Sequence, residues 1–116
     1  MKLNYTEQGL GAAVVLMHGM FGSLSNLGNL AKLLAQSYRV ISVDLRNHGD
    51  SPHEDDMDLV VMAADIVELI SDLDLASATF IGHSLGGKIA MQVALNNPQL
   101  VERLVVADIA PVDYPQ

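Results

Sequence analysis

The stretch FIGHSLGGKIA, residues 80–90, begins as an apolar strand and continues as a helix, with Ser84 at the bend. Three glycines, Gly82, Gly86 and Gly87, flank this bend. Residues two before and two after a serine at such a sharp turn must be very small, because larger side chains would collide there. The stretch therefore predicts a strand–serine–helix turn that holds one hydroxyl group clear of a sheet.

The remaining segments alternate between apolar runs and helical spacing of apolar residues. Strands are expected at residues 13–19, 39–45, 78–82 and 104–108, with a weak strand in 1–7; helices are expected after Ser25, around residues 63–73 and at 85–96. This alternation is typical of a mainly parallel sheet with right-handed crossovers. We therefore predict an α/β fold, a three-layer sandwich in which residues 1–116 belong to a single domain.

The helix around residues 63–73 has an apolar face and a polar remainder. The apolar face is expected to contain Ala63, Ile66, Val67, Ile70 and Leu73, whereas Asp65, Glu68 and Asp72 are expected off that face. The acidic run HEDDMD at 53–58 precedes this helix, so its aspartates are interpreted as helix caps rather than metal ligands. Arg46, in the polar loop before that run, is interpreted as a loop anchor.

Composition excludes several classes of partner. Six basic residues against fourteen acidic ones give a net charge of −8, which argues against nucleic acid or an anionic membrane as partner. There is no cysteine, so disulfides and thiolate metal sites are excluded. No apolar run approaches the roughly 20 residues of a membrane span, and the first residues lack a signal-peptide core. A soluble, cytoplasmic protein is expected.

Two chemistries compete for the turn at Ser84. Gly82-His83-Ser84-Leu85-Gly86 fits G-x-S-x-G, the turn that presents a nucleophilic serine. GHSLGGK also fits G-x-x-x-x-G-K, a loop that binds phosphate, but Ile89 stands where that loop needs a Ser or Thr to hold magnesium. The serine interpretation is therefore favoured.

Two upstream segments support it. MHGMFGS (17–23) follows the first apolar strand, and DLRNHGDSP (44–52) follows the second. Together HG-x-x-GS, D-x-R-N-H-G-x-S-P, GHS-x-GG and DIAPVDY, in this order, resemble the α/β-hydrolase superfamily, in particular its small bacterial esterases. The resemblance covers essentially all 116 residues, but only the N-terminal half of such an enzyme. It implies that the 13–19 and 78–82 strands are neighbours.

The resemblance also implies the site residues. Ser84 would be the nucleophile, and the backbone N–H groups of Met20 and Leu85 would form the oxyanion hole, with Phe21 as an alternative upstream donor. Asp108 would orient the catalytic histidine; alternatively it bonds local backbone at the strand end, and the acid lies one strand later. The implied substrate is a small acyl ester or thioester, and no cofactor is implied.

The catalytic histidine is not expected within this sequence. His18 is interpreted as a support for the oxyanion loop, His48 as part of the RNHG turn, His53 as solvated, and His83 as pointing away from its neighbour Ser84. We therefore expect a fragment that lacks its lid, C-terminal strands and base, and that is nearly inactive alone. Two alternatives remain open: a non-catalytic hydrolase-like scaffold, and a fragment that self-associates through the exposed edge of the 104–108 strand.

Overall fold

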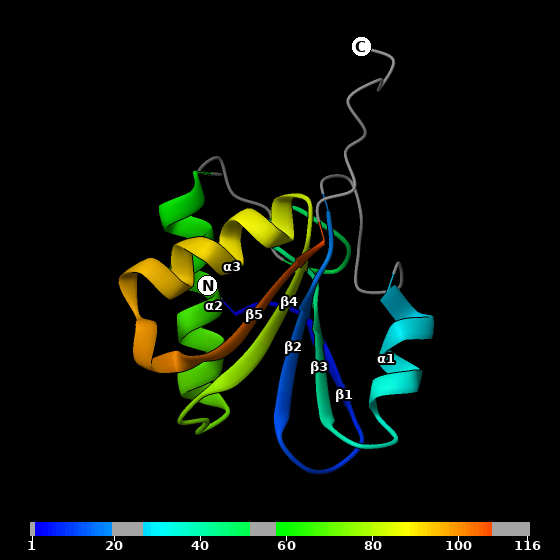
Figure 1. Cartoon of the computed structure of the whole chain (residues 1–116). Helices are drawn as coiled ribbons and strands as arrows, with labels where there is room; N and C mark the ends of the chain where they lie inside the picture. Colours follow the sequence, from blue (N-terminus) through cyan, green and yellow to red (C-terminus); the bar gives the residue numbers. More distant parts are fainter. Residues whose placement is uncertain (1, 20–26, 52–57, 108–116) are drawn as a thin grey trace.

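The computed structural model describes residues 2–19, 27–51 and 58–107. Along the chain these form β1 (Tyr5–Gln8), β2 (Ala13–Met17), α1 (Gly28–Leu34), β3 (Arg39–Val43), α2 (Leu59–Asp72), β4 (Ala78–His83), α3 (Leu85–Asn96), a short 3₁₀ helix (Pro98–Leu100) and β5 (Val101–Ala107) (Figure 1). The predicted elements are thus present in the predicted order. The predicted cap Ser25 lies outside the described residues.

The strands form one sheet in the order β1-β3-β2-β4-β5. β1 is antiparallel to β3, whereas the other neighbouring strands are parallel. The predicted α/β fold with a mainly parallel sheet is therefore confirmed, as is the expected pairing of the 13–19 and 78–82 strands. Because β2 pairs with β4 so that Met17 lies opposite Gly82, the segments that follow both strands leave the sheet at the same edge.

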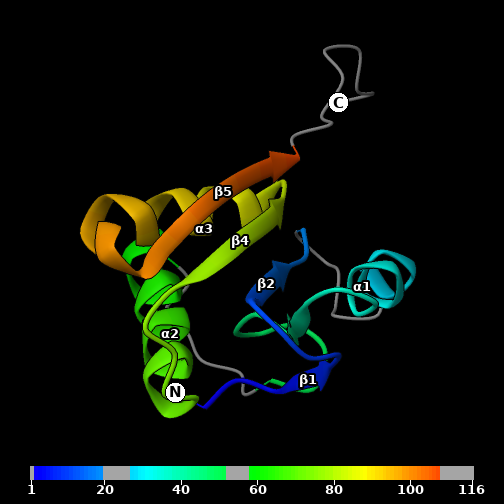
Figure 2. The ribbon, with the colours of Figure 1, turned by 60° about the horizontal axis from the view of Figure 1, so that its bottom comes forward.

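Helices cover both faces of the sheet, which gives the predicted three layers. Figure 2 shows α1 on one side of the strands and α2 with α3 on the other. Successive residues of β2 point to opposite faces: Val14 and Leu16 pack with α1, whereas Val15 and Met17 belong to the core under α2 and α3. All four side chains are buried, so β2 is covered on both faces, as a continuous apolar run predicts.

One prediction about α2 was wrong. Asp65 was expected off the apolar face, but its side chain is only 5% exposed. The reason is an ion pair with Arg46, which lies in the segment after β3. Asp58, by contrast, caps α2 as predicted, because its Oδ1 accepts a hydrogen bond of 2.8 Å from the Val61 amide.

β5 lies at one edge of the sheet. It begins at Val101, three residues before the predicted start. Its apolar residues Leu104, Val105 and Val106 are 38%, 48% and 37% exposed. Successive residues of a strand point to opposite faces, so both faces of β5 are incompletely covered by the part of the chain that the structure describes.

Candidate active site

Ser84 stands in a strained turn between β4 and α3. Its backbone angles are φ 55° and ψ −111°, a combination that non-glycine residues rarely adopt and that is found mostly at functional sites. Ser84 occupies the N-cap position of α3, yet its side chain makes no capping hydrogen bond. The hydroxyl group therefore stands at the positive end of the helix dipole without being used to terminate the helix.

The glycines around Ser84 are required by backbone contacts. A β-carbon at Gly82 would overlap the backbone of Gly86 and lie 2.5 Å from the Gly87 nitrogen. A β-carbon at Gly86 would overlap the Met17 carbonyl oxygen. These contacts are the collisions on which the G-x-S-x-G interpretation rests, so the steric part of that interpretation is confirmed.

The segment after β2 lies against this turn. The amide of Gly86 donates a hydrogen bond of 3.0 Å to the His18 carbonyl oxygen. A β-carbon built on Gly19 would lie 3.4 Å from the Ser84 β-carbon and 3.0 Å from His83 Nδ1. The loop after β2 and the turn after β4 therefore converge at the carboxyl ends of their strands, where ligands bind in open α/β sheets.

Of the predicted oxyanion-hole residues, the structure describes Leu85. It is the first residue of α3, and the N–H groups of a helix's first turn have no carbonyl partner within that helix. Met20 and the alternative donor Phe21 lie outside the described residues, although Gly19, directly before Met20, lies beside Ser84. Leu85 and Met20 therefore stay predictions as oxyanion donors.

His18 is held by both of its ring nitrogens. Nε2 lies 3.0 Å from the Leu45 amide nitrogen, and Nδ1 lies 2.7 Å from the Gly19 carbonyl oxygen. The residue is 1% exposed. Burial lowers the pKa of His18 below 6.5, and the nearby His48 lowers it further, whereas the bond to Gly19 and the charge of Asp44 oppose these effects. Because the Leu45 amide donates to Nε2, the acceptor nitrogen of His18 is already occupied.

His48 and His83 also lie in contact with neighbouring residues. His48 is buried, its Nδ1 lies 2.8 Å from the Arg46 carbonyl oxygen, and its ring centre lies 5.1 Å from that of His18. His83 Nε2 is buried without a hydrogen-bond partner among the described residues, in a ring that lies against Gly19. None of the hydrogen bonds described for these rings joins one of them to Ser84. His53 lies outside the described residues.

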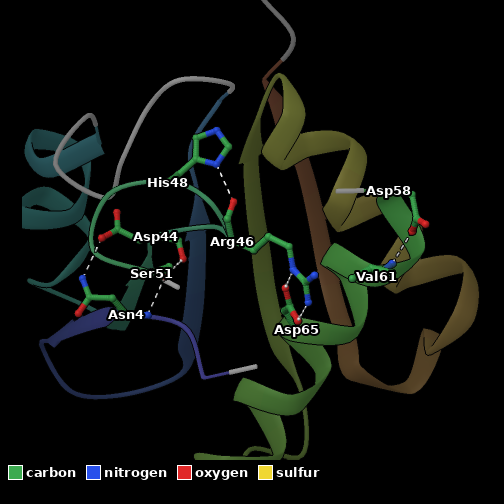
Figure 3. A network of polar contacts seen from close by, with 8 residues as sticks. All are labelled: Asn4, Asp44, Arg46, His48, Ser51, Asp58, Val61 and Asp65. Carbon is green, nitrogen blue, oxygen red and sulfur yellow. Dashed lines mark hydrogen bonds and ion pairs between the residues drawn. The ribbon is translucent and has the colours of Figure 1, made fainter. Parts of the chain in front are cut away.

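The segment that follows β3 is fastened to the N-terminal strand region (Figure 3). Asp44 Oδ2 accepts hydrogen bonds of 2.8 Å from Asn4 Nδ2 and 2.9 Å from the Asp50 amide. Ser51 Oγ donates to the Asp44 carbonyl and accepts from the Asn4 amide. Gly49, at φ 51°, lies so close to the Asp44 carboxylate that a β-carbon would overlap it. This network fixes the path of the loop that carries Leu45 past His18.

Arg46 and Asp65 hold the same loop to α2. Arg46 Nε and Nη2 donate to the two carboxylate oxygens of Asp65 at 2.8 and 2.9 Å (Figure 3). The prediction that Arg46 anchors a loop is confirmed, but the sequence did not reveal its partner. A signal was available: Asp65 interrupts an apolar helix face, with Met62 three residues before it and Leu69 four residues after it.

Asp108 lies outside the described residues, so its role stays a prediction. Its chain neighbour Ala107 is described: the carbonyl oxygen of Ala107 accepts a hydrogen bond of 3.3 Å from the Ser84 amide. Ala107, the last described residue, therefore lies beside the serine turn.

Comparison with known proteins identifies the family. A family model for the alpha/beta hydrolase fold matches residues 12–116. The chain belongs to the α/β-hydrolase family. This α/β hydrolase is 44% identical to esterase YbfF of Escherichia coli, covering 98% of this chain and 47% of YbfF. It is 50% identical to the sn-1-specific diacylglycerol lipase ABHD11 of Mus musculus, covering 86% of this chain and 33% of the lipase.

The solved structures agree with this assignment. A marine microorganism esterase superimposes on this α/β hydrolase with a TM-score of 0.91 at 40% identity, covering 99% of this chain and 44% of the esterase. This α/β hydrolase thus spans less than half the length of these relatives. Across residues 2–19, 27–51 and 58–107, no helix is long and apolar enough to cross a membrane.

Proposed function

We propose that this chain carries the nucleophile of a serine hydrolase that cleaves carboxylic esters or thioesters. The observation that carries the proposal is Ser84: it is strained, it stands at the N-terminus of α3, and its hydroxyl makes no capping bond. The names of the relatives, an esterase and a diacylglycerol lipase, support ester substrates. A small acyl ester is the substrate class that we propose; a cytoplasmic location stays a prediction.

The chemistry is acyl transfer to water. Ser84 Oγ attacks the acyl carbonyl carbon while a histidine removes the hydroxyl proton, and backbone N–H groups of Met20 and Leu85 stabilise the resulting oxyanion. The intermediate expels the alcohol or thiol, which takes that proton. Water, deprotonated by the same histidine, then attacks the acyl-enzyme, and the carboxylic acid leaves as Ser84 regains its proton. These steps require no cofactor.

We propose that the histidine comes from outside residues 1–116, which form the N-terminal portion of the hydrolase domain. His18 uses both ring nitrogens in structural bonds, and His48 is bonded to the Arg46 carbonyl. The His83 ring lies against Gly19, and no hydrogen bond described for it reaches Ser84. A general base must come within about 3 Å of the serine oxygen. Asp108 is proposed as the carboxylate that orients the histidine.

The test uses a completed domain, in which residues 1–116 are followed by the remaining C-terminal portion of YbfF. We expect hydrolysis of p-nitrophenyl butyrate and labelling by a fluorophosphonate probe, both abolished by Ser84→Ala. His83→Ala, the matched control on the same turn, should retain activity. If Ser84→Ala kept more than about a hundredth of the rate, the nucleophile assignment would be wrong. An unlabelled, inactive completed domain would instead support a non-catalytic scaffold.

A second proposal concerns the 116-residue chain alone, which we expect to be nearly inactive and to self-associate through β5. The exposed Leu104, Val105 and Val106 support it, because an apolar edge strand offers unpaired backbone groups to another copy. Size-exclusion chromatography with light scattering should show oligomers that Val105→Lys disrupts. Leu95→Lys, on α3 at a residue 77% exposed, is the control and should leave them intact. A monomeric wild-type chain would contradict this proposal.

A further inference from the structure

β1 and β5 are the two edge strands of the described sheet, and they differ in length and charge. β1 has four residues, all exposed, and its Glu7 pairs with Arg39 of β3 at 2.6 Å. A short, charged edge strand is protected against pairing with another chain. β5 has seven residues and ends in the apolar run 104–107. Among the described strands only β4 pairs with β5, so its outer edge is the one suited to pair with a further strand.

The hydrogen bonds to β4 determine which backbone groups of β5 point outward. In a strand, the N–H and C=O of one residue point to the same side, and those of the next residue point to the opposite side. The Ala107 carbonyl accepts a hydrogen bond from the Ser84 amide, so Ala107 points towards β4. The register of this end of β5 is regular, so Val105 points the same way. Leu104 and Val106 therefore direct their N–H and C=O groups to the outer edge.

A second copy of the chain can use these groups in an antiparallel pairing. Two identical chains that pair through the same surface are related by a two-fold axis. If the axis is perpendicular to the sheet, the two β5 strands are antiparallel and one residue lies opposite its own copy. With Val105 in that position, Leu104 lies opposite Val106 of the other copy on both sides of the axis. Leu104 and Val106 then exchange both N–H···O bonds, and the two Val105 residues form the non-hydrogen-bonded pair between them.

Neighbouring two-fold registers are less favourable. An axis centred on Leu104 places Val105 opposite the charged Arg103 of the other copy. An axis centred on Arg103 or on Glu102 places two like charges opposite each other, which destabilises a sheet. An axis centred on Val106 moves Leu104 beyond the end of the other copy's β5. The register centred on Val105 therefore gives three apolar pairs and no opposed like charges within β5.

We propose that the 116-residue chain forms a two-fold pair in which the β5 strands are antiparallel and centred on Val105, so that the two sheets join into one. This rests on the self-association proposed above and specifies its geometry. Because the strands of the two copies run in opposite directions, their Ser84 turns lie at opposite edges of the joined sheet. Pairing therefore does not complete the site of either copy.

Cysteine cross-linking tests the register, because the sequence contains no cysteine of its own. In this pair the two Val105 α-carbons lie about 4.5 Å apart, as in other non-hydrogen-bonded antiparallel pairs, and a disulfide spans that distance. Under mild oxidation Val105→Cys should therefore form covalent dimers, measured by non-reducing gel electrophoresis. Circular dichroism and light scattering before oxidation check that the variant folds and pairs.

Leu104→Cys is the matched control, since Leu104 is 38% exposed and Val105 is 48% exposed. In the proposed register the two Leu104 residues are diagonal neighbours, about 7–8 Å apart. That separation is too long for a disulfide, so the yield should be at least about tenfold lower than for Val105→Cys. A mixture of Leu104→Cys and Val106→Cys chains should restore cross-linking, and this measurement decides the matter even where Val105→Cys does not fold.

The outcomes separate the geometry from the earlier proposals. Cross-linking of Leu104→Cys without Val105→Cys would move the axis, and equal cross-linking of both would indicate parallel strands in register. Either result would overturn the inference and leave self-association intact. Oligomers in which none of these variants cross-links would place the interface elsewhere, and a monomeric chain would contradict self-association itself. None of these results bears on Ser84 as the nucleophile, which the completed domain tests separately.

Discussion

Gly86 and His18 join the two loops of the site through one backbone hydrogen bond, 3.0 Å from the Gly86 nitrogen to the His18 carbonyl oxygen. The bond connects the first turn of α3 to the end of β2. It exists because Gly86 has no side chain, which lets the helix backbone approach the Met17 and His18 carbonyls closely. The nucleophile turn and the proposed oxyanion loop are therefore coupled mechanically.

Gly86→Ala should break this coupling. The added β-carbon would lie 2.6 Å from the His18 carbonyl oxygen and still nearer that of Met17, and backbone atoms cannot rotate away. We expect a loss of about 1–3 kcal/mol or more in the free energy of unfolding, measured with urea. Gly28→Ala is the control, since a β-carbon there meets no atom within 4 Å. Equal stability of the two variants would contradict the prediction.

Asp65→Asn should destabilise the fold through the loop after β3. The substitution removes the negative charge that faces the Arg46 guanidinium, in a pair whose side chains are 9% and 5% exposed. We expect a loss of about 3–5 kcal/mol in the free energy of unfolding. Asp72→Asn is the matched control, because Asp72 pairs with Lys2 at 2.7 Å on the surface. Its effect should be within experimental error, as exposed pairs contribute little; a similar loss in both variants would refute the prediction.

Acid should destabilise the folded chain through His18. Burial holds the pKa of His18 below its ordinary value of 6.5 in the folded state. Below pH 6.5 the unfolded chain therefore binds a proton that the folded chain does not, and stability falls as pH decreases towards the folded-state pKa. Above pH 6.5 this contribution is fully present. Urea unfolding between pH 5 and 8 measures how steeply the free energy of unfolding changes with pH. His18→Asn should make this dependence weaker; if the dependence were unchanged, other groups would be responsible for it.

Asp108→Asn tests the proposed acid. Ala107, which precedes Asp108 in the sequence, accepts a hydrogen bond from the Ser84 amide. In the completed domain we expect the variant to fold normally and to lose about 10⁴ in kcat, because the histidine would no longer be held in the correct tautomer. A loss smaller than about tenfold would move the acid to a later strand.

The sequence alone determined the features that depend on near neighbours. The collision that requires Gly82 involves Gly86 and Gly87, within five positions of chain, so the motif around Ser84 predicts the turn without knowledge of the rest. The collision that requires Gly86 involves the Met17 and His18 carbonyls, and only the folded structure reveals it. The strand at 13–17 was equally predictable, because a run of apolar residues needs cover on both faces. The pairing of β2 with β4 followed only from family resemblance, and the rest of the strand order was not predicted.

Only the tertiary structure decided how distant polar groups are satisfied. The sequence pattern predicts an exposed position for Asp65. In the structure Arg46, 19 residues away, pairs with it. His18 has no assignable tautomer until the Leu45 amide reaches its Nε2 across 27 positions. The physical reason is that a buried charge or ring nitrogen must find a partner. The partner depends on which backbone and side-chain groups the folded sheet brings together. The local pattern of apolar and polar residues does not predict this.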